Sequence, residues 1–159
     1  MKQVHILFFL LTTLLSCNKS DERSQNQDLL IGQWQLTSFV NELSGTSIDS
    51  SDPNYFDPVD NTGEVLIIIE FYENGGFEGV TSRNEFGGSY TFNNSKTVII
   101  FNGPEGSETG ETEYGNLFFD NLILNYNPQS QKVESSFELN GNIFKLYYSE
   151  NEYMKFERM

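Results

Sequence analysis

The sequence contains no alanine, one cysteine and one histidine, and only 9 basic residues against 23 acidic ones. Alanine is the strongest helix former, so its absence argues against an all-helical protein. His5 and Cys17 both lie near the amino terminus. Residues 18–159 therefore offer no histidine for acid–base chemistry, no thiol nucleophile and no usual zinc ligand set. No disulfide can form within the chain, so its stability must come from packing.

The shortage of basic residues also limits the partners. The formal net charge is −14. Such a negative field repels phosphate backbones and anionic lipid surfaces. We expect no nucleic-acid partner.

Aromatic and turn-forming residues are abundant, with 14 phenylalanines, 8 tyrosines and 13 glycines. Several short segments are predicted to be strands, some because apolar and polar residues alternate, and residues 65–72 because they form a nearly continuous run of β-branched and aromatic residues. These segments are residues 30–40, 65–72, 77–81, 88–93, 97–101, 133–139, 143–148 and 153–158. Residues 41–63 and 102–113 are predicted to be loops, and Asn140-Gly141 favours a type I′ hairpin turn.

From Tyr114 to Leu122 apolar residues recur every three to four positions, which fits a helix, while LILNY at residues 122–126 fits a strand. Of the two, we favour a short helix. We therefore predict a mainly β (α+β) domain. Its strands form a single antiparallel, strongly twisted sheet or a small open barrel, with one short helix.

The amino terminus has the form of a secretory signal. Lys2 precedes an apolar run over residues 6–15, which is too short to span a bilayer as a helix. The following Leu14-Leu15-Ser16-Cys17 resembles a bacterial lipobox, whose cysteine is acylated and becomes the first residue of the mature protein. We expect Cys17 to be lipidated, so that a lipid anchor makes the membrane a partner.

The sequence thus divides into three parts. Residues 1–16 are the lipoprotein signal peptide, 17–28 are the acylated cysteine and a flexible polar tether, and 29–159 are one β domain. Asn18 next to the cysteine resembles lipoproteins sent to the outer membrane. We expect an outer-membrane lipoprotein of the cell envelope, on the periplasmic face or the cell surface.

Residues 84–90, NEFGGSY, fit the pattern N-x-F-x-G-x-Y. This pattern resembles the motif of META domains, the family of HslJ-like lipoproteins, and residues 29–158 follow the order of that family's segments. The resemblance implies antiparallel β structure and a binding, scaffolding or stress-protective role without catalysis. Where the family usually has a cysteine before the motif asparagine, this sequence has Arg83, so the usual disulfide is missing.

A second resemblance is to lipocalin-like lipoproteins. Gly32-x-Trp34 on the first strand resembles the lipocalin G-x-W, and Arg158 on the last strand would lie over the indole ring. Such a cation–π contact contributes about 1 kcal/mol. This resemblance implies a barrel that holds a small hydrophobic molecule or a lipid.

Two acidic segments are the candidate metal sites. The first loop carries Asp49, Asp52, Asp57 and Asp60, with Glu42 and Glu64 near its ends, and carboxylates on a loop are the ligands that Ca²⁺ prefers. The spacing is not that of an EF-hand, and we interpret these carboxylates as solvated. The second segment, with Glu105, Glu108, Glu111 and Glu113, has still less geometry. We predict no metal, no cofactor and no catalytic residue.

Adjacent aromatic residues in strands are the remaining candidates. Side chains alternate between the faces of a strand, so only one of Phe71 and Tyr72, and one of Tyr147 and Tyr148, can lie in the core. The other is available on the outer face. We expect core packing to dominate, and an envelope protein or a small hydrophobic ligand to be the partner.

Overall fold

A computed structural model of the chain describes residues 28–55, 66–93, 95, 97–106 and 110–159. Its strands are β1 (Gly32–Asn41), β2 (Thr46–Asp49), β3 (Ile68–Phe71), β4 (Gly76–Val80), β5 (Glu85–Phe92), β6 (Val98–Gly106), β7 (Tyr126–Asn127), β8 (Lys132–Asn140), β9 (Ile143–Tyr147) and β10 (Glu152–Arg158). The helix α2 (Glu113–Leu122) lies between β6 and β7. The chain is mainly β with a short helix, as predicted.

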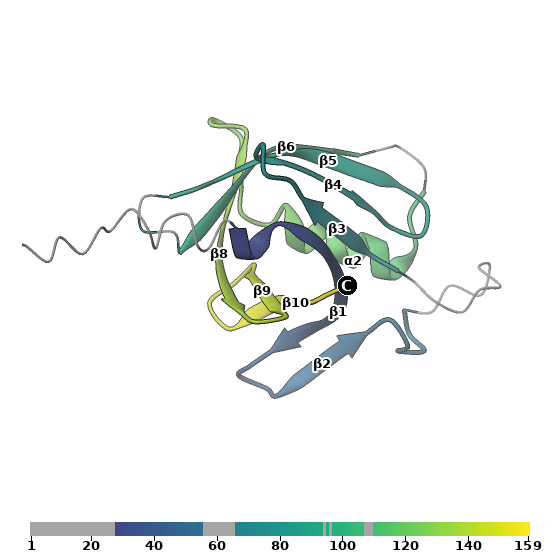
Figure 1. Cartoon of the computed structure of the whole chain (residues 1–159). Helices are drawn as coiled ribbons and strands as arrows, with labels where there is room; N and C mark the ends of the chain where they lie inside the picture. Colours follow the sequence, from purple (N-terminus) through teal and green to yellow (C-terminus); the bar gives the residue numbers. More distant parts are fainter. Residues whose placement is uncertain (1–27, 56–65, 94, 96, 107–109) are drawn as a thin grey trace, which may run out of the picture.

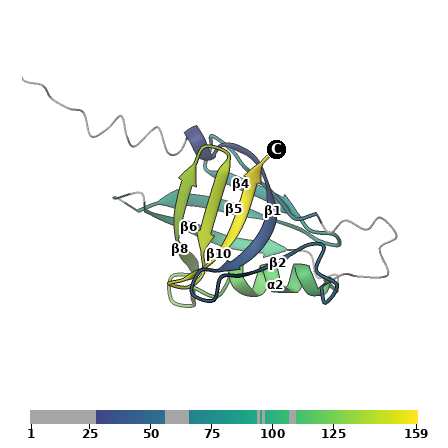
Figure 2. The same cartoon turned by 90° about the horizontal axis from the view of Figure 1, so that it is seen from below.

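Eight of the strands close into an antiparallel barrel (Figure 1). The order runs β1-β3-β4-β5-β6-β8-β9-β10, and β10 pairs back onto β1 from Trp34 to Asn41. Figure 2 shows β8, β10 and β1 running across the same wall. We expected a single sheet or an open barrel. The barrel closes because β1 uses both of its edges, one for β10 and the other for β3 and β2.

Two strands extend into segments that were predicted to be loops. β2 lies within residues 41–63 and pairs with the end of β1. β6 runs on to Gly106, where it pairs with Phe86 of β5. Backbone pairing needs no apolar side chain, so a turn-like sequence such as NGPEG can continue a strand beside an existing partner. Residues 56–65 and 107–109 of these segments lie outside the described residues.

The barrel interior is occupied by side chains. The largest fully buried ones, each at most 1 % exposed, are Trp34, Phe71, Phe77, Phe101, Phe144 and Phe156. The ring of Phe71 lies 5.1 Å from that of Tyr90 and 5.8 Å from that of Phe144, at angles of 83° and 87°. These edge-to-face contacts are favourable between aromatic rings. Aromatic packing therefore fills the barrel interior.

Helix α2 confirms the predicted helical segment. The side chain of Thr112 caps it by accepting a hydrogen bond from the backbone N–H of Gly115 at 3.0 Å. The buried rings of Tyr114 and Phe118 face the barrel, and their centroids lie 5.1 Å from those of Phe39 and Phe86 respectively. No helix in the described segments is both long and apolar enough to cross a bilayer.

The first and last strands are joined by the expected contact between Trp34 and Arg158. The guanidinium lies 4.4 Å from the indole centroid. Arg158 also donates hydrogen bonds to the carbonyl oxygens of Leu29 and Ile31, and the Trp34 Nε1–H donates to the carbonyl oxygen of Leu30 at 2.7 Å. The segment that enters the barrel is thus held at three successive carbonyl groups.

Candidate binding groove on the outer sheet face

A groove of about 680 Å³ lies on the outer face of β3, β4, β5 and β6. Helix α2 lies on the opposite side of these strands (Figure 1). The volume of the groove falls within the range of ligand-binding clefts. The lining side chains include Gln33, Ile68, Glu70, Glu78, Glu85 and Glu105.

The strand register places the polar lining residues in one row across five strands. Gln33 of β1 is opposite Glu70 of β3, and Glu70 is opposite Glu78 of β4. Gly87 of β5 is opposite both Glu78 and Glu105 of β6. Residues directly opposite in an antiparallel pair share a face. We call this row, Gln33, Glu70, Glu78, Gly87 and Glu105, the acidic row.

An apolar row runs beside the acidic row. Ile68 of β3 is opposite Val80 of β4, and Val80 is opposite Glu85 of β5. Ile68 is half-buried and Val80 is 41 % exposed. The groove therefore offers an apolar strip alongside its carboxylates.

The acidic row lacks a compensating cation. Within the described segments no lysine or arginine lines the groove, and Glu70, Glu78 and Glu105 make no ion pair. Glu70 instead accepts a hydrogen bond from the Gln33 amide at 2.9 Å, and Glu78 accepts one from the Tyr72 hydroxyl at 3.1 Å. Like charges directly opposite each other on neighbouring strands destabilise a sheet. The Glu70 and Glu78 pair therefore lowers the stability of the sheet.

The charge of the row acts on Tyr72, the outer member of the Phe71 and Tyr72 pair. Desolvation, the hydrogen bond with Glu78 and the negative charges of Glu70 and Glu78 all raise the pKa of the Tyr72 hydroxyl. The phenol therefore stays neutral and remains a hydrogen-bond donor within the groove.

Gly87 leaves a gap in the middle of the acidic row. A Cβ atom at this position would lie 3.0 Å from the carbonyl oxygen of Phe77 and 3.4 Å from Cγ of Glu78. The close approach of β4 and β5 therefore favours glycine. As a result, the row has no side chain between Glu78 and Glu105.

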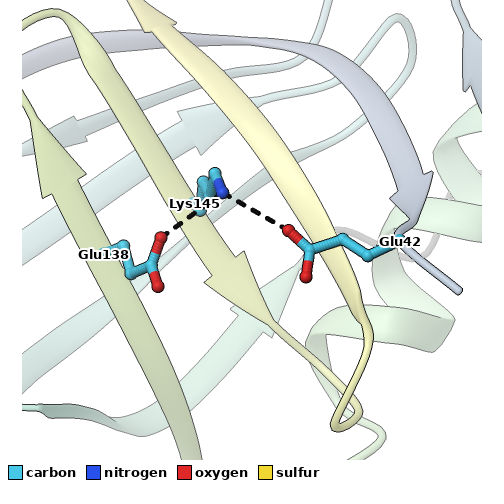
Figure 3. Close-up of polar contacts among 3 residues, drawn as sticks. All are labelled: Glu42, Glu138 and Lys145. Atoms are coloured by element: carbon cyan, nitrogen blue, oxygen red, sulfur yellow. Dashed lines mark hydrogen bonds and ion pairs between the residues drawn. The ribbon is translucent and has the colours of Figure 1, made fainter. Parts of the chain in front are cut away.

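The outer face of β8, β9 and β10 shows the opposite arrangement. Lys145 of β9 is directly opposite Glu138 of β8, and its Nζ lies 3.3 Å from that carboxylate and 3.5 Å from Glu42 (Figure 3). It also lies 4.6 Å from the ring centroid of Tyr153, which packs against Tyr147. Burial acts to lower the pKa of Lys145, but the hydrogen bond with Glu138 and nearby negative charge outweigh it and raise the pKa. Here the cross-strand carboxylate is compensated.

A buried polar cluster holds the turn between β4 and β5 next to the groove. One carboxylate oxygen of Glu111 accepts hydrogen bonds from the Thr81 hydroxyl and, at 2.7 Å, from the Asn84 amide. The other oxygen accepts from the backbone N–H of Thr112 at 2.8 Å. Glu111 thereby joins the β4–β5 turn to the start of α2.

The residues of the N-x-F-x-G-x-Y pattern have structural roles. Asn84 belongs to the polar cluster, and the ring of Phe86 packs against Phe118. A Cβ atom on Gly88 would lie 2.7 Å from the carbonyl oxygen of Asn102, so the strands approach too closely for a side chain. The Tyr90 hydroxyl donates to the carbonyl oxygen of Tyr72 at 3.1 Å. The pattern therefore builds the strands that carry the groove.

The first acidic loop is described only in part. The Asp49 carboxylate accepts hydrogen bonds from the backbone N–H and the hydroxyl of Ser51, which lower its pKa, and Asp52 accepts from Asn54. These bonds stabilise local turns. Within the described residues no group of three or more histidine, cysteine or acidic side chains is arranged to hold a metal ion. Cys17, Asp57, Asp60, Glu64 and Glu108 lie outside those residues.

The other candidates are dispersed over the surface. Glu42 pairs with Lys145, Glu105 belongs to the acidic row, Glu111 belongs to the polar cluster, and Glu113 begins α2. Tyr148 packs against the core while Tyr147 lies outside, as alternation predicts. Sequence reasoning missed the acidic row, because Gln33, Glu70, Glu78, Gly87 and Glu105 meet only through the strand register.

Comparison with known proteins identifies a similar fold. Neither the models of protein families nor the curated proteins match this sequence. A solved structure of a DUF4847 family protein from Bacteroides vulgatus is similar with a TM-score of 0.55 and 16 % identity, over 84 % of this chain and 96 % of that one. An uncharacterized protein from Bacteroides eggerthii gives a TM-score of 0.45 and 15 % identity, over 82 % and 99 %. At this identity, the first similarity shows a shared fold.

Proposed function

We propose that this protein is an envelope lipoprotein, anchored through acylated Cys17, whose barrel is a non-catalytic binding or scaffolding module of the outer membrane. The lipobox-like segment before Cys17 supports the anchor. The META-like pattern supports a module without chemistry of its own.

The filled barrel interior is the observation that carries the proposed mode of action. The interior positions hold large aromatic side chains that contact each other, whereas the groove lies on the outer face. A module built in this way works through its outer surface. We propose that another envelope protein binds there.

The junction between tether and barrel fits an anchored protein. Arg158 binds the carbonyl groups of Leu29 and Ile31, just after the proposed tether of residues 17–28. A force applied to the tether would therefore act on the hydrogen bonds that Arg158 of β10 makes to these two carbonyl groups. Such a clamp keeps β1 in the barrel wall.

A lipocalin-like lipid binder is the second candidate function. The closed eight-stranded barrel and the contact between Arg158 and Trp34 favour it. This candidate requires that the interior rings move apart to admit a ligand. Binding of a fluorescent fatty acid distinguishes the two functions.

The anchor is tested by fractionation of cells that produce the full chain. We expect the wild-type protein in the outer-membrane fraction. Cys17→Ser, or treatment with globomycin, which inhibits the lipoprotein signal peptidase, should leave the signal uncleaved. Cys17→Ser should also abolish incorporation of radiolabelled palmitate. Equal cleavage and labelling of the Cys17→Ser variant would contradict the proposal, and Ser20→Ala is the matched control.

A further inference from the structure

The uncompensated acidic row sets the groove apart from the rest of the described surface. On the far face, the cross-strand partner of Glu138 is Lys145, whereas in the groove the cross-strand partner of Glu70 is Glu78. Only a cation from outside the groove can compensate the Glu70 and Glu78 pair. We propose that the groove docks an extended segment of a partner protein that carries two basic residues four positions apart.

The spacing of the acidic row specifies the segment. Neighbouring strands lie about 4.8 Å apart, so Glu70 and Glu105, which are three strands apart, are separated by about 14 Å along the row. In an extended segment, side chains on one face recur about every 6.7 Å, so positions i and i+4 are about 13 Å apart. A basic residue at i meets Glu70 and Glu78, and one at i+4 meets Glu105.

The gap at Gly87 and the apolar row specify the residue between the two cations. The side chain at i+2 lies over Gly87, where the acidic row has no side chain of its own. Val80 of β4 is diagonal to Gly87 in the register and offers apolar surface to this side chain, while Ile68 lies next to Glu70 on β3. The preferred segment is thus basic-x-apolar-x-basic. The aliphatic stems of lysine or arginine also suit this strip, because they can lie on apolar surface while the charged group reaches a carboxylate.

Fluorescence anisotropy of labelled peptides tests this inference on the purified full-length chain in non-ionic detergent. The probe is a terminally blocked peptide, Lys-Thr-Leu-Thr-Lys, and the control peptide has the same composition in the order Lys-Lys-Leu-Thr-Thr. We expect the first to bind more tightly. Its affinity should fall steeply as salt is raised to about 1 M, where the Debye length is about 3 Å.

Charge-removing variants locate the binding surface. Replacing both Glu70→Gln and Glu78→Gln should weaken the first peptide by about fivefold, since each exposed ion pair contributes about 0.5 kcal/mol. Glu134→Gln on β8 removes one exposed charge outside the groove and is the matched control for Glu105→Gln. Circular dichroism checks that each variant is folded. Glu134→Gln should leave the affinity unchanged.

Three results would overturn the inference. These are equal affinity for the two peptide orders, equal weakening by Glu105→Gln and Glu134→Gln, and competition by free spermine at or below the peptide concentration. The last would assign the groove to a small polyamine. The inference rests on the proposed function. The anchoring experiment measures cleavage and labelling, whereas this one measures peptide affinity, so either can fail without the other.

Discussion

The guanidinium of Arg158 lies 4.4 Å from the centroid of the Trp34 indole and joins the last strand to the first. The same group donates to the carbonyl oxygens of Leu29 and Ile31. One side chain therefore contributes both to the closure of the barrel and to the attachment of the amino-terminal segment.

Replacement of Arg158 should destabilise the barrel. Arg158→Ala removes the cation–π contact and two charge-assisted hydrogen bonds, and we expect the free energy of unfolding to fall by about 2 kcal/mol. Arg158→Lys keeps the charge but loses the forked hydrogen bonds, so its effect should be intermediate. Urea denaturation followed by tryptophan fluorescence measures both. Lys155→Ala, whose amine pairs with exposed Glu157, should change stability by less than about 0.5 kcal/mol.

The Tyr114 hydroxyl predicts a stabilising substitution. Tyr114 is fully buried, and its hydroxyl has no hydrogen-bond partner among the residues that the structure describes. Tyr114→Phe removes this unsatisfied group and should raise the free energy of unfolding by about 1 kcal/mol. Tyr90→Phe is the matched control with the opposite sign, since the Tyr90 hydroxyl donates to the carbonyl oxygen of Tyr72. A loss of stability in Tyr114→Phe would show that the hydroxyl is satisfied in solution.

Alkaline pH should destabilise the barrel through Tyr148. Desolvation and the charge of Glu152 raise the pKa of Tyr148 to about 12 from an ordinary value of 10.0. The folded state thus keeps a proton that the unfolded state loses. This contribution to stability is complete below about pH 10 and is lost as the pH rises towards 12.

Urea denaturation at a series of pH values checks this dependence. Tyr148→Phe should make the decline in stability above pH 10 shallower. Tyr126→Phe, which removes a hydroxyl at an exposed position, is the matched control. An unchanged decline in Tyr148→Phe would contradict the assignment.

The acidic row predicts that stability and binding oppose each other. Glu78→Lys places opposite charges on the cross-strand pair with Glu70, as in the pair of Glu138 and Lys145. We expect the free energy of unfolding to rise by about 0.5 kcal/mol, while basic peptides lose affinity. Thermal denaturation at low and high salt measures the first effect, which salt should reduce. Lower stability in Glu78→Lys would mean that the Glu70 and Glu78 pair carries no repulsion.

Local sequence patterns predicted most of the elements. Alternation identified strands such as β1, β8 and β10, and the spacing of Tyr114, Phe118 and Leu122 identified α2. These patterns are local, because each depends on which face of one element is buried. The contact of Arg158 with Trp34 was also predicted, from a resemblance and not from the spacing of residues.

Features that depend on pairing between distant segments were missed. Closure requires β10 to pair with β1, and no pattern within either strand indicates that pairing.

The hairpin of β8 and β9 turns at Gly141 and Asn142, one residue later than predicted. Only Gly141 has a positive φ, of 58°, which is typical of a type II′ turn instead of type I′. A shift of one residue changes the register of a strand pair. The acidic row depends in the same way on the register of its own strands, which no local pattern indicates.

The central claim is that the barrel interior is filled and that the protein works through its outer surface. The most direct test is titration of the purified full-length protein with a fluorescent fatty acid, with serum albumin as the positive control. We predict no saturable binding. Saturable binding that unlabelled fatty acid displaces, and that an enlarging substitution at the interior position Leu36→Phe abolishes, would contradict the claim and identify a lipid carrier.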